Sequence, residues 1–312
     1  MNSLLICLNA IVPIFLIIAA GYAAKRAGII MEREVPRMNA AAFKIFMPMM
    51  CFYNVYNSEL SSAVRPRLLV YTFCAILAVF ALALLFAIVC VGDRSRRSVV
   101  AQGLYRSNYL ILGVPFVAGL VGETELGVAA VMGALIAPTF NVLAVVLLES
   151  YNGGKPGWKK LALGIAKNPL ILGSLAGLLL LALGVRLPAP LETAARDMSR
   201  VSNPLLLFLL GAFFHFDDAK EHWRELVAVS LGRLIVIPAL ALFPAMYLGF
   251  RGAEFATLIA VFASSTAVAS FVMAEQMGGD AKLAGNIVVV TSACASFTLF
   301  AWSLLFKALG AF

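Results

Sequence analysis

Four residues within one apolar stretch carry the most chemical information in this sequence. The stretch YRSNYLILGVP, residues 105–115, contains Arg106, Asn108, Gly113 and Pro115. Arginine supplies a full positive charge with a planar set of donors, and asparagine supplies a neutral donor. Glycine and proline weaken a helix, which frees backbone groups to face a ligand. Together these residue types are suited to binding an anion.

The segment around them, about residues 98–121, is long and apolar enough to cross a membrane. A charge in lipid is costly, so the arginine should face protein or a wet cavity. We therefore expect the helix to break near Ser107 and Asn108. The second half-helix would then aim its positive N-terminal end at the middle of the membrane.

The composition of the whole chain places this segment in a membrane protein. The 312 residues are 62% hydrophobic and only 13% charged, with a mean hydropathy of +0.96. Soluble chains are roughly half apolar and a quarter charged. The apolar runs have helix length, which excludes a β-barrel and predicts an all-α polytopic fold. The net charge of +8 is spread over short loops, so nucleic acid is not an expected partner.

The apolar runs predict ten transmembrane helices joined by short loops. Their approximate limits are 4–24, 38–58, 66–91, 98–121, 127–149, 161–183, 191–214, 223–249, 253–276 and 283–309. The basic residues of the loops on one side of the membrane are Lys25, Arg26, Arg33, Arg37, Arg94, Arg96, Arg97, Lys155, Lys159, Lys160, Lys220, Arg224 and Lys282. Those on the other side are Arg65, Arg67, Arg186, Arg251 and Lys307. Basic loops are retained on the cytoplasmic side, so the side with more basic residues is predicted to be cytoplasmic and both termini are predicted to be periplasmic.

An internal repeat of five spans is visible at a fixed offset of 156 residues. The matched pairs are Pro13 with Pro169, Gly21 with Gly177, Gly28 with Gly184, Lys44 with Arg200, and Pro48 with Pro204. An odd number of spans inverts the second copy, so residues 1–155 and 156–312 form two inverted repeats, an arrangement typical of secondary transporters. The ninth span is then the partner of the fourth, and it holds Ser264, Ser265 and Thr266 at the corresponding depth.

These motifs together resemble the auxin efflux carrier family. The run Asn108-x-x-x-x-Gly113-x-Pro115 is similar to the fourth span of that family, and STAVASFVMAEQMGGD is similar to its ninth. Pro169 and Pro204 also fit, and the resemblance covers the whole chain. It implies a bacterial inner-membrane carrier of organic anions, such as the dicarboxylates malonate or malate. It further implies elevator-type alternating access, a scaffold of spans 1, 2, 6 and 7 that also forms a homodimer, and a transport domain of spans 3–5 and 8–10, with the fourth and ninth spans crossing at the site.

The resemblance and the residue types together give a set of candidate site residues. The predicted substrate-binding residues are Arg106, Ser107, Asn108, Ser265 and Thr266. Residues expected to shape the helices are Pro48, Gly113, Pro115 and Pro204. Secondary candidates are Lys44, Arg200 and Arg233. The family often has proline where this chain has Ser107 and Ser265.

Several of these candidates also have a purely structural interpretation. Arg106 could cap the carbonyl end of the first half-helix, and Ser265 and Thr266 could bond back to their own helix. Lys44 and Arg200 could steer anions or extend to the membrane surface. Arg233 lies inside the eighth span and must face a partner or a cavity.

Other classes of function are less compatible with the sequence. No span carries a catalytic constellation, so an enzyme is not expected, and neither is a cofactor. The loop at residues 215–222 holds two histidines and two aspartates, but we interpret it as a solvated loop and not as a metal site. A sensor or channel of the same fold is the alternative. Coupling to H⁺ or Na⁺ is left open, because Glu149 and Glu275 lie only near span ends.

Overall fold

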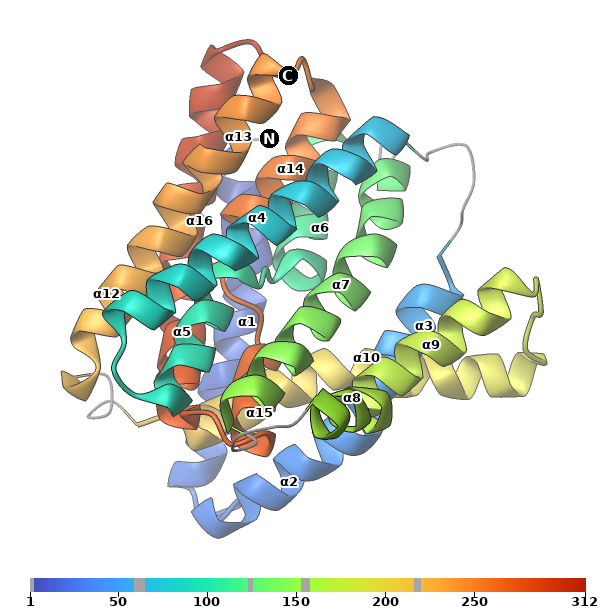
Figure 1. The fold of residues 1–312 in the computed structure, drawn as a ribbon, viewed down its shortest axis with the longest axis vertical. Coiled ribbons are helices and arrows are strands. Elements are labelled where there is room, and N and C mark those ends of the chain that lie inside the picture. The colour runs from blue at the N-terminus through green and yellow to red at the C-terminus, as the bar shows by residue number, and fades with distance from the viewer. Residues whose placement is uncertain (1–2, 59–64, 123–125, 153–157, 216–219) are drawn as a thin grey trace.

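The computed structural model describes residues 3–58, 65–122, 126–152, 158–215 and 220–312, and these residues form helices joined by short connections (Figure 1). The α-helices are α1 (Ser3–Arg26), α2 (Val35–Ala41), α3 (Met47–Tyr56), α4 (Pro66–Cys90), α5 (Arg94–Tyr105), α6 (Val114–Val121), α7 (Leu126–Asn152), α8 (Trp158–Lys167), α9 (Pro169–Ala182), α10 (Ala189–Phe213), α12 (Trp223–Leu231), α13 (Ile237–Tyr247), α14 (Gly252–Ala263), α15 (Ala269–Gln276) and α16 (Ala281–Ala308). The 3₁₀ turn η1 (Glu32–Glu34) precedes α2, and the π-helical turns are η2 (Ala42–Phe46), η3 (Tyr109–Gly113) and η5 (Gly232–Val236).

Several of these helices have the length and composition of membrane spans. Among the described residues, α4, α7, the continuous run of α12 to α13, and α16 are each long and apolar enough to cross a membrane. Shorter apolar helices cover residues 109–121, 169–182 and 252–263. Each predicted span coincides with one helix or with consecutive helical segments. The chain is therefore an all-helical, polytopic membrane protein.

One predicted span differs from the structure in detail. The sixth span, residues 161–183, is divided into α8 and α9 at Asn168. The Oδ1 atom of Asn168 accepts a hydrogen bond of 3.0 Å from the backbone N–H of Leu170, which caps α9. Pro169 explains the division, because a proline disfavours helical backbone in the residue before it. The predicted repeat boundary at residues 155/156 lies outside the described residues.

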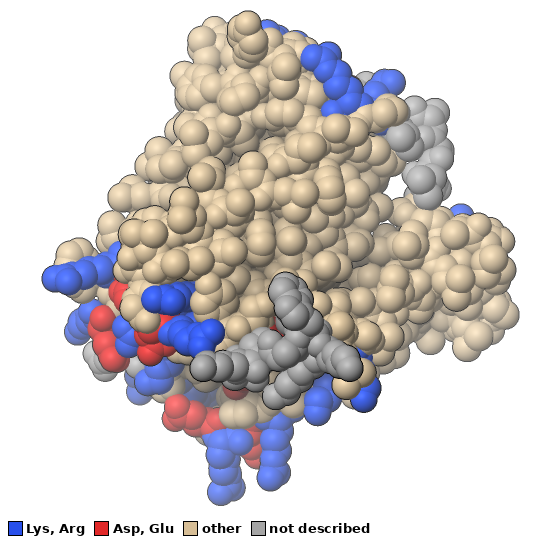
Figure 2. All heavy atoms as spheres, in the orientation of Figure 1, with Lys and Arg blue, Asp and Glu red and all other residues tan. Residues whose placement is uncertain are grey.

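Charge and apolar surface are separated along the molecule. Figure 2 shows acidic and basic side chains gathered at one end of the visible face, around the ends of α2, α12 and α15. Arg96 pairs there with Glu225 and with Asp280, each at 3.5 Å. Beyond this end the visible face is a broad uncharged belt, and α4 exposes large apolar side chains along its length. An apolar surface of this extent is suited to lipid and not to water.

Two helix pairs pack unusually closely because glycines lie at their contacts. In the first pair, a Cβ atom at Gly21 of α1 would collide with the carbonyl oxygen of Phe208 in α10. In the second pair, a Cβ atom at Gly177 of α9 would collide with the carbonyl oxygen of Phe52 in α3. Small residues permit this approach of backbones, which is a common way to join helices in membranes.

The fourth and ninth spans are both interrupted, and the interruptions lie against each other. Helix α5 ends at Tyr105 before η3, and α14 ends at Ala263 before α15. The connecting stretches run antiparallel, with a β-bridge between Ser107 and Thr266. The N–H of Asn108 donates to the carbonyl of Ser265 at 2.8 Å. The predicted break near Ser107 and Asn108 is confirmed.

Candidate functional site

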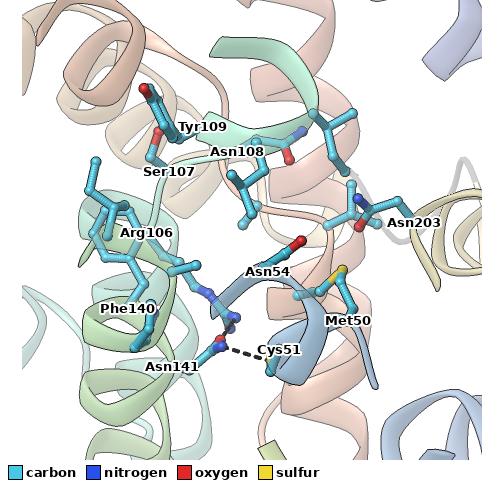
Figure 3. A pocket seen from close by; sticks show the side chains of 18 of the residues that line it. Met50, Cys51, Asn54, Arg106, Ser107, Asn108, Tyr109, Phe140, Asn141 and Asn203 are labelled. Carbon is cyan, nitrogen blue, oxygen red and sulfur yellow. Dashed lines mark hydrogen bonds between the residues drawn. The ribbon is translucent and has the colours of Figure 1, made fainter. Parts of the chain in front are cut away.

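A cavity of about 70 Å³ lies beside this crossing (Figure 3). It is lined by Met50, Cys51, Asn54, Arg106, Ser107, Asn108, Tyr109, Leu110, Ile111, Ile136, Ala137, Pro138, Phe140, Asn141, Ser174, Asn203, Ala267, Val268 and Ala269. One water molecule needs about 10–15 Å³ of cavity volume. The cavity therefore has room for several waters or for one small organic molecule.

Two helix N-termini contribute to the wall of this cavity. Residues 109–111 form the start of η3, and residues 267–269 lead into α15, which begins at Ala269. The first N–H groups of a helix have no partner within the helix, and each helix N-terminus carries about half a positive charge. Both ends therefore favour a negatively charged group in the cavity.

Arg106 supplies the full positive charge of the cavity. Its side chain is buried, with 4% of the residue exposed. Nη2 donates to Oδ1 of Asn141 at 2.6 Å, and Nη1 donates to Sδ of Met273 at 2.7 Å. Across the described part of the chain no carboxylate forms an ion pair with Arg106. A buried cation with only neutral partners is costly, and a bound anion would remove that cost.

Asn108 and Ser107 present further polar groups beside Arg106. The Nδ2 atom of Asn108 and the Oγ atom of Ser107 are both buried without a hydrogen-bond partner, and both residues line the cavity (Figure 3). Buried polar groups in native proteins usually have partners. These two polar groups therefore point to a ligand or water molecule that would form hydrogen bonds with them.

The cavity also has polar lining residues that the sequence analysis did not select. Asn54 comes from α3, Asn203 from α10 and Asn141 from α7, and all three lie around the cavity in Figure 3. Nδ2 of Asn141 donates to Sγ of Cys51 at 3.1 Å. The only available signal was an amide side chain in the middle of an apolar span, which by itself does not reveal the face it occupies.

Ser265 and Thr266 occupy the crossing, but their side chains do not line the cavity. Oγ of Ser265 lies 3.2 Å from Oγ of Ser292 in α16, which donates to it. Oγ1 of Thr266 donates to the carbonyl of Gly103 in α5 at 2.7 Å. These hydroxyls connect the crossing to its neighbouring helices. The next three residues along the chain face the cavity instead.

Arg233 holds the C-terminal ends of both interrupted helices. Its guanidinium donates from Nε to the carbonyl of Ser264 at 2.9 Å and from Nη2 to that of Val261 at 3.0 Å. Nη1 donates to the carbonyls of Leu104 and Tyr105 at 3.2 and 3.5 Å. Arg233 thus caps the carbonyl ends of α5 and α14, and the guanidinium of Arg106 is directed to the cavity.

The glycine and prolines of the predicted set have structural positions. Gly113 packs on α14, where a Cβ atom would lie 3.1 Å from the carbonyl oxygen of Ala260. Pro115 follows the π-turn η3, Pro48 follows η2, and Pro204 lies within the continuous helix α10.

The remaining charged candidates lie away from the cavity. Lys44 is exposed, and Arg200 lines a surface groove between α1 and α10. Within the described residues no three His, Cys, Asp or Glu side chains gather where a metal ion could be held. Two residues of the candidate loop, Asp217 and Asp218, lie outside those residues.

Comparison with known proteins gives a family match over nearly the whole chain. The family described as membrane transport protein matches residues 6–154 and 158–303. An uncharacterized transporter of Methanocaldococcus jannaschii is 22% identical over 308 residues, covering 96% of this chain and 98% of the relative.

Two further relatives have similar coverage. An uncharacterized transporter of Methanothermobacter thermautotrophicus is 22% identical over 301 residues, covering 95% of this chain and 97% of the relative. A protein of Rhizobium meliloti with the name "Putative malonate transporter" is 27% identical over 301 residues, covering 90% of each chain.

Proposed function

We propose that this chain, which belongs to the membrane transport protein family of the auxin efflux carriers, moves small organic anions across the inner membrane. The substrates are mono- or dicarboxylates, and they bind in the cavity beside Arg106. The observation that carries this proposal is the buried guanidinium of Arg106, which has neutral partners and lies where two helix N-termini meet.

The charges around the cavity are suited to a carboxylate. Arg106 contributes one positive charge, and each of the two helix N-termini contributes about half a charge. A carboxylate has two oxygens that accept hydrogen bonds, and arginine presents a fork of donors that matches them. Asn108 offers an additional donor that has no partner in the structure. The relative named for malonate is in keeping with this substrate class.

Two inverted five-span repeats account for contacts that recur at the same offset of 156 residues. Gly28 and Gly184 lie two residues beyond the ends of α1 and α9 and have φ of 71° and 65°, a conformation that glycine adopts readily. In both caps the next residue donates its N–H to the carbonyl five residues before it, at 3.0 Å. The same offset relates Gly21 to Gly177, and it also relates their respective partners, Phe208 and Phe52. These equivalent contacts support an arrangement of two five-span repeats.

The location of the cavity supports alternating access of the elevator type. One wall comes from α3, α9 and α10, which belong to the proposed scaffold. The other wall comes from the connection that follows α5, from η3 and α7, and from the start of α15, which belong to the proposed transport domain. Movement of one body along the other would carry the cavity and its anion across the membrane. The exposed apolar face of α9, with Leu172, Leu175 and Leu179, gives the scaffold a surface for a second copy in a homodimer.

The first test of this proposal is substitution of Arg106 in the purified protein. Arg106→Ala should weaken malonate binding by roughly ten- to a hundredfold, since a hydrogen bond to a charged group contributes about 1.5–3 kcal/mol. Arg106→Lys should recover part of the affinity, because the charge remains and the planar fork does not. Binding is measured by calorimetry and stability by thermal melting.

Arg200→Ala is the matched control, because it removes a guanidinium from a membrane helix outside the cavity. It should leave malonate affinity unchanged. Saturable malonate uptake into proteoliposomes, with counterflow by unlabelled malonate, would identify a carrier and not a channel or sensor. Unchanged affinity in Arg106→Ala would remove Arg106 from the site and contradict the proposal.

A further inference from the structure

We propose that Arg233 is a positioning residue that acts as the fixed cation of the crossing, so that the protein binds its anion without a coupling Na⁺ ion. This inference rests on the proposed function. It concerns the face of the crossing that lies away from the anion cavity. The four carbonyls that Arg233 contacts carry the argument.

These carbonyls belong to two helix ends that would otherwise have no partner. Leu104 and Tyr105 end α5, and Val261 and Ser264 lie at the end of α14. The last carbonyls of a helix have no donor within the helix, and each C-terminus carries about half a negative charge. Two C-termini together are therefore equivalent to about one negative charge, which the single charge of Arg233 balances.

Such carbonyls are also ligands for an inorganic cation. In carriers with broken helices, the C-terminal ends of half-helices and unwound carbonyls coordinate Na⁺. Here a guanidinium bonds to four of them, and Arg233 is only 1% exposed. The nearby hydroxyl of Thr266 is already bonded to Gly103. A sodium ion would have to displace a cation that is covalently part of the protein.

The surrounding elements bring Arg233 to this place. Arg233 lies in the π-turn η5, two residues beyond the end of α12. Gly232 permits close approach to α5, because a Cβ atom there would lie 2.5 Å from Cδ2 of Leu104. Pro238, the second residue of α13, follows the widened turn and has no N–H to donate. A π-turn inside a helix is often found at a functional position.

The balance of charge at the crossing has a consequence for the anion. Arg233 neutralises the two negative helix ends on one face. Arg106 and the two positive helix ends are then left unopposed at the cavity on the other face. The anion is therefore attracted by charges that the protein supplies permanently.

The first experiment measures malonate affinity of the wild-type protein in Na⁺ and in N-methyl-D-glucamine at equal pH and ionic strength. The affinity should be the same in both. In N-methyl-D-glucamine, Arg233→Ala should bind malonate about tenfold more weakly or worse, the effect of one charge-assisted hydrogen bond. Guanidinium ion at low millimolar concentration should restore part of the affinity and raise the melting temperature of this variant, but not of the wild type. Arg233→Lys should be intermediate, and Arg200→Ala should show none of these effects.

Either of two results would overturn the inference. The first is a malonate affinity of the wild-type protein that is tenfold or more higher in Na⁺ than in N-methyl-D-glucamine. The second is a malonate affinity of Arg233→Ala equal to that of the wild type when no guanidinium is added. If Arg233→Ala does not fold, the inference is decided by the wild-type malonate affinity in the two cations and by the malonate affinity of Arg233→Lys. If the wild type binds no carboxylate in either cation, the proposed function fails, and the effect of guanidinium on melting temperature still decides the role of Arg233.

Discussion

Two buried arginines at one crossing have different roles because they meet different atoms. Arg106 contacts an amide oxygen and a thioether sulfur, and both partners are neutral. Arg233 contacts four carbonyls at the negative ends of two helices. An anion would give the guanidinium of Arg106 a charged partner that it lacks, whereas loss of the Arg233 guanidinium would leave two helix ends uncapped. Residue type alone therefore does not define function in this membrane interior.

A prediction at this scale concerns Asn108. Asn108→Ala should lower malonate affinity by roughly two- to tenfold, since a neutral hydrogen bond contributes about 0.5–1.5 kcal/mol. The melting temperature should change little, because Nδ2 has no partner to lose. Equilibrium binding and thermal melting check both parts.

Asn286→Ala is the control for this substitution. Its Nδ2 is also buried without a partner, but Asn286 lies in α16 and does not line the cavity. Malonate affinity should not change in this variant. Equal loss of affinity in both variants would show that Asn108 acts through stability and not through contact with the anion.

At the scale of elements, three helices widen into a π-turn just before a proline. The turns η2, η3 and η5 precede Pro48, Pro115 and Pro238. A proline has no N–H to donate, so the carbonyl four residues before it lacks its usual partner. For Pro238 that carbonyl belongs to Leu234, and it accepts instead from the indole N–H of Trp302 at 2.9 Å. These prolines lie near the start of the α-helices that continue from the π-helical turns, so they do not end the helical runs.

A second prediction tests the interruption of the ninth span. Ser265→Pro should fold and keep malonate transport, because Ser264 has φ −67° and ψ 159°, the backbone that a residue before proline adopts. Leu258→Pro, within α14, should lose about 3 kcal/mol or more of stability. Melting temperature and uptake by proteoliposomes are the measurements. Failure of Ser265→Pro to fold would mean that an N–H needed at this position has been lost.

A third prediction tests the close helix pairs. Gly21→Ala and Gly177→Ala should each destabilise the protein by about 1–3 kcal/mol, because overpacking forces the backbones of the paired helices apart. Gly92→Ala is the control, since a Cβ atom there would meet nothing within 4 Å. Thermal melting of the three variants in one detergent gives the comparison. Similar melting temperatures for all three would contradict the close packing of these pairs.

At the scale of the whole molecule, charge and chain direction define an orientation. Helix α1 begins and α16 ends toward one end of the molecule (Figure 1), and most of the charged side chains on the visible face, including all the acidic ones, gather toward the other (Figure 2). Basic residues are retained on the cytoplasmic side of a membrane. We therefore propose that the charged end is cytoplasmic and that both termini are periplasmic.

A fourth prediction tests this orientation with reporter fusions. Alkaline phosphatase joined after Phe312 should be active, and green fluorescent protein at the same position should be dark. A fusion that ends after α7 serves as the control and should give the opposite result, because an odd number of proposed spans precedes it. Fluorescence without phosphatase activity at the C-terminus would contradict the ten-span arrangement.

The sequence by itself determined where helices form and where one of them breaks. Apolar runs of helix length defined the membrane segments because lipid requires every backbone group to be bonded within the segment. The combination of Arg106, Asn108, Gly113 and Pro115 indicated the interruption, since each residue is unfavourable in a continuous helix in lipid. These are local properties, and they do not depend on which helices become neighbours.

Only the tertiary structure decided what the side chains at the crossing contact. Arg106 meets Asn141 from α7 and Met273 from α15, and Arg233 meets the ends of α5 and α14. The hydroxyl of Thr266 turns to α5 and away from the cavity. These contacts depend on the rotation and depth of each helix against partners distant in the chain. Because packing across the crossing fixes rotation and depth, no local pattern of residues encodes them.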